Sequence, residues 1–280
     1  MTDRPTDAAE PTEERARAVL ASEGHATREI QALTLTVLAV SEATGPFVRV
    51  RGALRGTVVH SDWALPNLAV RLSVPALDGG EPASRIYTVR TFDPATETIE
   101  LDVLRHGHDS PMMRWIEAVR PGEQVPLVGP RPHFVPDHES GRPALLLADD
   151  SAVAALHSVF RHWPDGARGV AYVRTADQEV IDELDAPAGV EVIRVDGPLL
   201  DAAREAPSGT TLWAAGERTE MRAVRDHFRR ERGLPRGEVR PYGYWQAATD
   251  STAVDKRRLA HFGVLMERGE SFAEVDDLDI

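Results

Sequence analysis

Hydrophobic residues in the first half of the chain recur at every second position. Leu33, Leu35 and Val37 alternate with polar neighbours, and similar runs recur as far as Val128. Glycine, proline and asparagine separate these runs. Short alternating segments with turn residues between them are typical of antiparallel strands. We therefore expect residues 31–140 to form an antiparallel barrel or sandwich.

One helix interrupts this series of strands. Ser110 followed by Pro111 has the order of an N-cap and a first helical residue. Met112, Trp115 and Ile116 then follow at helical spacing. The free N–H groups and the positive end of such a helix favour an anion, so this helix start is a candidate pyrophosphate site. A plain capped helix would show the same pattern.

From Pro143 onward, apolar strands alternate with helical segments. Residues 144–148 form a continuous apolar run, as expected of a parallel strand that is buried on both faces. The expected elements after it are helix 152–160, strand 169–174, helix 178–184, strand 190–195, helix 199–205, strand 211–215 and helix 219–231. Strict alternation of this kind is typical of a doubly wound α/β sheet, which we expect over residues 141–248.

The two ends of the chain are polar and acidic. We expect a flexible arm at residues 1–30, and a helical extension with an acidic tail at residues 249–280. The net charge of −13 argues against nucleic-acid binding, which needs a basic surface. The chain has no cysteine, no apolar segment that could span a bilayer and no signal-peptide pattern, so a cytoplasmic protein without a membrane span is expected.

The strand expected at residues 84–90 has an arginine and a tyrosine two positions apart. Arg85, Tyr87 and Val89 share one face, and Thr88 lies on the other. A guanidinium can bind a phosphate through its fork of donors, and an aromatic ring can lie against a planar ring system. The pair suits a flavin nucleotide, although an ordinary exposed strand would show the same spacing.

Two turns follow expected strands of the α/β region. The first contains Asp149, Asp150 and Ser151, and the second contains Gly216 and Glu217. Ligands of open α/β sheets bind outside the carboxyl ends of the strands. Ser151 is expected to cap the next helix, and Gly216 allows a ligand to approach the backbone closely. The turns suit a nicotinamide nucleotide, and they equally suit ordinary strand-to-helix connections.

A loop after the strand at residues 98–104 contains His106, His108 and Asp109. Two histidines and an aspartate can bind a metal ion, but nothing indicates a further ligand or a fixed geometry. We therefore predict no metal site.

Several motifs, in order along residues 31–248, resemble those of the siderophore-interacting proteins. These are flavin-dependent ferric-siderophore reductases of the ferredoxin-reductase-like superfamily. The motifs are Arg85-x-Tyr87-Thr88-x-Arg90, His106-Gly107 followed by Ser110-Pro111 and Trp115, Trp213-Ala214-Ala215-Gly216-Glu217, and Gly243-Tyr244-Trp245. Each motif is weak alone, but their number and order make the resemblance specific.

The resemblance implies a six-stranded antiparallel flavin-binding barrel over residues 31–140, followed by an α/β domain for NADH or NADPH over residues 141–248. It places Arg85 at the ribityl phosphate of FAD, Tyr87 against the isoalloxazine and Thr88 at the ring edge. The residues implied for FAD are Arg85, Tyr87, Thr88, His106, Ser110, Met112, Met113, Asp149, Ser151 and Trp245. The residues implied for the nicotinamide nucleotide are Asp150, Gly216 and Glu217.

Two functional hypotheses follow. The first is an FAD-dependent oxidoreductase that uses NADH or NADPH to reduce a small-molecule acceptor, above all ferric iron in a siderophore-like chelate. The second is a repurposed member of the family that has altered or lost its use of flavin or nicotinamide and acts as a biosynthetic enzyme or a small-molecule-binding protein. The second is motivated by Met112 and Met113, which replace two small residues of the family motif, and by Asp150.

Overall fold

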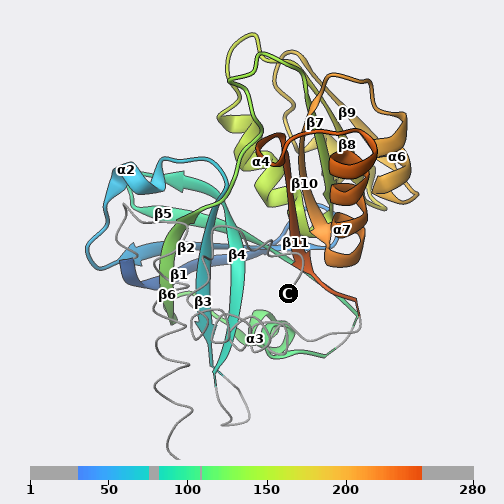
Figure 1. The fold of residues 1–280 in the computed structure, drawn as a ribbon. Helices are drawn as coiled ribbons and strands as arrows, with labels where there is room; N and C mark the ends of the chain where they lie inside the picture. Colours follow the sequence, from blue (N-terminus) through green and yellow to red (C-terminus); the bar gives the residue numbers. More distant parts are fainter. Residues whose placement is uncertain (1–30, 76–81, 108, 248–280) are drawn as a thin grey trace, which may run out of the picture.

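The computed structural model describes residues 31–75 and 82–247, with the exception of His108. The expected N-terminal arm and C-terminal extension lie outside these residues. The described chain folds into a β-barrel and an α/β domain that stand side by side (Figure 1). No helix in the described stretches has the length and apolar character needed to cross a bilayer.

Six strands close into an antiparallel barrel in the order β1-β2-β5-β4-β3-β6. The strands are β1 (Gln31–Glu42), β2 (Phe47–Arg55), β3 (Leu68–Val74), β4 (Ala83–Asp93), β5 (Thr98–Leu104) and β6 (Gln124–Pro132). A short helix, α2 (His60–Trp63), follows β2, and α3 (Pro111–Ala118) joins β5 to β6. The six-stranded barrel is confirmed, and the sandwich alternative is wrong.

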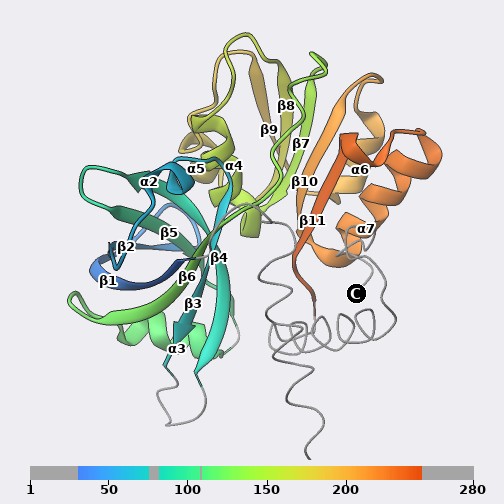
Figure 2. The same cartoon turned by 60° about the vertical axis from the view of Figure 1, so that its left-hand side comes forward.

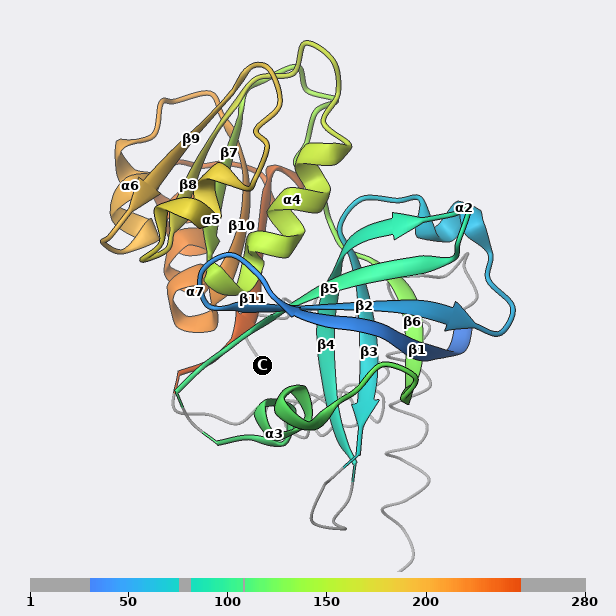
Figure 3. The ribbon, with the colours of Figure 1, turned by 180° about the vertical axis from the view of Figure 1, so that it is seen from behind.

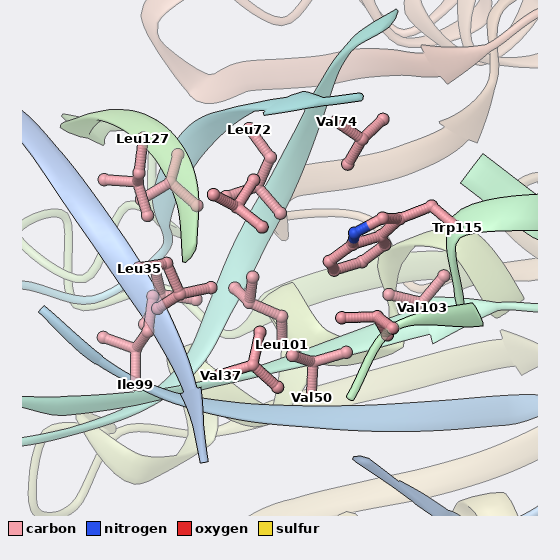
Figure 4. Close-up of a cluster of buried hydrophobic side chains, with 14 of the residues drawn as sticks. Leu35, Val37, Val50, Leu72, Val74, Ile99, Leu101, Val103, Trp115 and Leu127 are labelled. Carbon is pink, nitrogen blue, oxygen red and sulfur yellow. The ribbon is translucent and has the colours of Figure 1, made fainter. Parts of the chain in front are cut away.

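The alternating pattern of the strands fills the barrel with apolar side chains. Leu35 and Val37 of β1 are fully buried in one cluster with Leu72, Leu101 and Trp115 (Figure 4). Burial of a large aliphatic side chain contributes roughly 1.5–3 kcal/mol relative to leaving it exposed. The barrel is therefore a well-packed support for the functional residues on its strands.

Five parallel strands form the sheet of the second domain, in the order β11-β10-β7-β8-β9. They are β7 (Ala144–Asp149), β8 (Gly169–Arg174), β9 (Val190–Val195), β10 (Thr211–Glu217) and β11 (Val239–Trp245). All residues of the central strand β7 are buried, as its continuous apolar run predicts.

Helices cover both faces of this sheet, which confirms the doubly wound fold. The helices are α4 (Val153–Arg161), α5 (Gln178–Asp182), α6 (Leu199–Glu205) and α7 (Arg218–Asp226). Helices α4 and α5 lie on the face nearer the barrel and bury Phe47 of β2 in their cluster, whereas α6 and α7 cover the opposite face (Figure 2). The packing of Phe47 ties the two domains together.

The sequence did not predict β11 or α2. Strand β11 contains Pro241 and Gly243, which lower strand propensity. They are tolerated because β11 is an edge strand that pairs only with β10. The helix expected at 219–231 is α-helical only to Asp226 and continues as a π-helical turn, His227–Glu231.

Candidate functional site

Strand β4 presents its two faces to different parts of the molecule. Val89 belongs to the barrel core and Tyr87 packs against that core, whereas Thr88 and Arg90 contact residues of the α/β domain. The expected alternation along this strand is therefore observed. Burial raises the pKa of the Tyr87 hydroxyl, so this phenol is neutral across the physiological range.

Helix α3 packs against β3 and β4, next to the strand with the predicted flavin motif (Figure 3). Ser110 caps the helix as predicted: its Oγ accepts a hydrogen bond of 3.2 Å from the Met113 backbone N–H, and Pro111 is the first helical residue. The side chains of Met112 and Met113 are buried in the barrel core. They anchor the helix to the barrel.

The residues of β3 and β4 have the donor chemistry that a flavin nucleotide requires. Arg85 donates to the Ser84 carbonyl at 2.8 Å, and Arg71 of the neighbouring strand donates to Ser84 Oγ at 2.8 Å. Both guanidinium groups thus bond Ser84, although the register of β3 with β4 puts Arg71 and Arg85 on opposite faces of the sheet. Cations for phosphate oxygens, the ring of Tyr87 and the hydroxyl of Thr88 fit FAD, so the described residues are compatible with this cofactor.

At the other domain, the Asp149 carboxylate joins the ends of three strands. Its Oδ1 accepts a hydrogen bond from Ser151 N at 2.9 Å, and its Oδ2 accepts one from Glu217 N at 2.9 Å and one from Trp245 Nε1 at 2.8 Å. A buried carboxylate needs such donors, because an unpaired charge away from water is costly. Asp149 therefore fixes β7, β10 and β11 relative to one another.

The predicted role of Ser151 as a helix cap is wrong. Asp149 is the N-cap of the 3₁₀ turn Asp150–Ala152, and Ser151 Oγ donates to the Asp149 carboxylate. Helix α4 starts one turn later, at Val153, without a side-chain cap. The Asp149 carboxylate accepts from the Ser151 backbone N–H, which leaves the serine hydroxyl as a second donor to the same carboxylate.

Gly216 leaves room for a carboxylate of the chain itself. A Cβ at this position would lie 2.7 Å from Asp149 Oδ2, so a larger residue would displace that group. Glu217, the next residue, is the N-cap of α7 and accepts a hydrogen bond of 2.9 Å from Glu220 N. Both residues thus have structural partners, and their contact with a nicotinamide nucleotide stays a prediction.

A cavity of about 310 Å³ opens at the carboxyl ends of β7, β8 and β9. It brings together four residues that the sequence singled out. They are Asp149, Asp150, Ser151 and Trp245. It also contains Arg174, Thr175 and Asp196, which sequence reasoning missed, although their places at the ends of expected strands could have indicated them.

Tyr244 connects this edge of the sheet to the flavin strand. Its hydroxyl is hydrogen-bonded to the Thr88 side chain and lies 3.5 Å from Asn67 Oδ1. Burial raises the pKa of Tyr244 to about 12. The two halves of the candidate site therefore meet at β4 and β11. His106 is exposed in the β5–α3 loop and does not line the cavity, so its predicted contact with FAD stays a prediction.

Comparisons with known proteins agree with this arrangement. Residues 66–134 match the family model of the siderophore-interacting FAD-binding domain, and residues 142–248 match that of the siderophore-interacting protein. The ferric acinetobactin reductase of Acinetobacter baumannii is 33% identical over 263 residues, which cover 90% of this chain and 92% of that protein. The chain belongs to the siderophore-interacting protein family.

Solved structures support the same assignment. The siderophore-interacting protein from Acinetobacter baumannii superposes with a TM-score of 0.80 at 33% identity, covering 85% of this chain and 99% of that one. A cytochrome P450 reductase from Amycolatopsis, at 23% identity, has a TM-score of 0.63 over 80% of this chain and 72% of its own, and shows the shared fold alone. The predicted family and its ferredoxin-reductase-like architecture are confirmed.

Proposed function

We propose that this siderophore-interacting protein is an FAD-dependent reductase that takes electrons from NADH or NADPH and delivers them to ferric iron in a siderophore. A bound FAD would accept a hydride from the nicotinamide and pass on its two electrons singly. One hydride therefore supplies the electrons that reduce two ferric ions. Hard oxygen donors bind ferric iron far more tightly than ferrous iron, so reduction weakens the chelate.

The observation that carries this proposal is the meeting of β11 with the barrel beside the flavin strand, where the Tyr244 hydroxyl lies 3.5 Å from Asn67 Oδ1 and interacts with the Thr88 side chain. Thr88 lies in the strand whose chemistry fits a flavin, and Tyr244 lies in β11, at the edge of the sheet where open α/β domains bind nucleotides. A hydride donor held at that edge would face the flavin strand. Positioning of this kind is the main contribution that a protein makes to cofactor chemistry.

In this proposal each part of the site has a separate task. Arg85 and the positive end of α3 hold the flavin phosphates, and Tyr87 packs against the ring. The strand-end cavity holds the nicotinamide nucleotide, so in this proposal Asp149, Ser151 and Trp245, which the resemblance assigns to FAD, line the nucleotide site instead. The name of the Acinetobacter baumannii relative, a ferric acinetobactin reductase, supports a ferric siderophore as the acceptor.

The proposal can be tested on the purified full-length chain. We expect a yellow protein whose visible flavin absorbance bleaches when NADH or NADPH is added without oxygen. Addition of a ferric siderophore with a ferrous chelator should then restore the flavin absorbance and release two ferrous ions per reduced flavin. A protein that binds no added FAD would contradict the proposal.

Arg85→Ala tests the flavin site itself. Loss of one charge-assisted contact to phosphate should weaken FAD binding roughly 10- to 100-fold. The measurement is the FAD retained per protein after gel filtration, together with a fluorescence titration. Arg51→Ala is the matched control because Arg51 is an exposed arginine of β2. Equal FAD affinity in the two variants would show that Arg85 has been given the wrong role.

The alternative of a repurposed protein without flavin receives no added support from Met112 and Met113. Both side chains pack in the barrel core, where they fill space between α3 and the strands. They are therefore accounted for by packing, and a loss of flavin binding is not needed to explain them.

A further inference from the structure

The strand-end cavity differs from a phosphate site in its charge. Its ionisable lining residues are Asp149, Asp150, Asp196 and Arg174. Three carboxylates and one guanidinium leave an excess of negative charge. A second phosphate group on a bound nucleotide would be repelled there, because like charges interact strongly when they are partly shielded from water.

The arginines near this cavity already have acidic partners. Arg174 Nη1 lies 2.7 Å from Glu220 Oε2, and Arg174 Nη2 lies 3.6 Å from Asp149 Oδ2. Arg194, just before the end of β9, pairs with Asp196 and donates to the Thr175 carbonyl at 3.2 Å. A phosphate would have to break one of these ion pairs to obtain a cation.

Asp150 offers what a hydroxyl group needs. The residue lines the cavity and its side chain is hydrogen-bonded by Thr175, while its buried Oδ1 has no hydrogen-bond partner in the described structure. A buried acceptor without a hydrogen-bond partner costs free energy, so a ligand that supplies the missing donor binds more tightly. A ribose hydroxyl in the cavity can donate a hydrogen bond to the Asp150 carboxylate, which lines it. A phosphate dianion offers only acceptor oxygens, so it cannot donate a hydrogen bond to Asp150.

We propose that this cavity binds the adenosine ribose of the nicotinamide donor through its free 2′-hydroxyl and rejects a 2′-phosphate, so that the donor is NADH and not NADPH. This inference rests on the proposed function, since it names the donor for the same site. Asp150 is the acceptor for the hydroxyl. Asp196 pairs with Arg194 and so competes with any phosphate for this arginine. The location agrees with the edge where α/β sheets bind the ribose of dinucleotides.

Anaerobic stopped-flow reduction of the FAD-loaded protein tests the inference. The second-order rate of flavin bleaching should be at least about 100-fold higher with NADH than with NADPH. Calorimetry gives a readout that needs no turnover: the FAD-loaded protein should bind 5′-ADP and show no measurable binding of 2′,5′-ADP at the same concentrations.

Two variants sharpen the test. Asp150→Asn removes one negative charge, and Asp196→Asn frees Arg194. Each should raise the ratio of the NADPH rate to the NADH rate roughly tenfold, and the double variant should raise it further. Asp165→Asn is the matched control, because it removes an exposed carboxylate from the loop that precedes β8, at the opposite end of the sheet. It should leave the ratio unchanged.

The outcomes separate this inference from the proposed function. If dithionite bleaches the flavin but neither nucleotide does, the proposed function fails. If both nucleotides bleach it at equal rates, the flavin reductase stands and the preference for NADH is wrong. If Asp150→Asn weakens FAD binding and leaves the ratio unchanged, the cavity holds the adenosine of FAD, which also has a free 2′-hydroxyl, and the inference is overturned.

Discussion

Two charged regions lie between or beside the domains of this protein, and they are built in opposite ways. The first is an ion-pair cluster of Arg49, Arg90, Asp102 and Glu183, which joins the barrel to the end of α5. The second is the strand-end cavity around Asp150. Both contain carboxylates beside arginines, but only the cavity leaves a buried carboxylate oxygen without a partner.

In the cluster, every charge meets an opposite charge at close range. Arg90 lies 2.8 Å from Asp102 Oδ2 and 2.9 Å from Glu183 Oε1. Arg49 lies 2.7 Å from Asp102 Oδ1 and 2.8 Å from the same Glu183 oxygen. Both carboxylate oxygens of Asp102 are thus paired. The cluster therefore sets the position of the domains and gives no indication of binding.

In the cavity, by contrast, the pairing is incomplete and the space is open. Asp149 has all its donors from the chain, whereas Asp150 Oδ1 has none. The comparison teaches that the charge of a region is a poor guide to function. Unfilled hydrogen-bonding capacity beside an open cavity is a better one.

The largest expected effect comes from breaking the cluster. Asp102→Ala leaves two arginines with one carboxylate at a buried interface and should lower the free energy of unfolding by roughly 3–5 kcal/mol. Urea unfolding of the FAD-free protein measures this change. Glu117→Ala, which removes an exposed carboxylate of α3, should change it by less than about 0.5 kcal/mol. Similar midpoints for both variants would show that the cluster adds no net stability.

A smaller effect should come from His157 of α4, which packs beside the cluster. Burial is the largest cause that lowers the pKa of His157 to about 4, and the positive charges of Arg90 and Arg161 also lower it. A hydrogen bond to the Arg90 backbone and the negative charge of Asp102 act in the opposite direction. The unfolded chain binds a proton near pH 6.5 and the folded chain does not, so stability falls as the pH drops from 6.5 towards 4. The loss should reach at most about 3 kcal/mol.

His157→Gln should remove most of this acid sensitivity, because glutamine does not titrate. The measurement is the free energy of unfolding at several pH values between 4 and 7. His162→Gln, a substitution of an exposed histidine just after the same helix, serves as the control and should keep the wild-type slope. An unchanged slope in His157→Gln would assign the acid sensitivity to other groups.

The smallest effect is expected on the cavity side. Gly216→Ala places a Cβ 2.7 Å from Asp149 Oδ2, which is held by Glu217 and Trp245, and should cost roughly 1–3 kcal/mol of stability. Displacement of Asp149 should also change the fluorescence of the half-exposed Trp245. Gly237→Ala, where an added Cβ would meet nothing within 4 Å, is the control. Equal behaviour of the two variants would mean that the Asp149 carboxylate is not rigidly held.

The local rules of the sequence predicted most of the fold. The alternation of Leu33, Leu35 and Val37 predicted β1, and the unbroken apolar run at 144–148 predicted the buried strand β7. Ser110 and Pro111 predicted the start of α3 correctly. These features depend on residues that are close together in the chain, so their pattern can be read directly.

What the sequence by itself determined is thus the order and kind of the elements, together with the motifs of the family. Only the tertiary structure decided that Asp149 takes the capping role given to Ser151, that Arg174 and Asp196 join Asp150 at one cavity, and that β11 pairs at the sheet edge despite Pro241. The physical reason is distance along the chain. Strand ends that lie dozens of residues apart meet only when the sheet has formed, and their side chains then compete for the same donors.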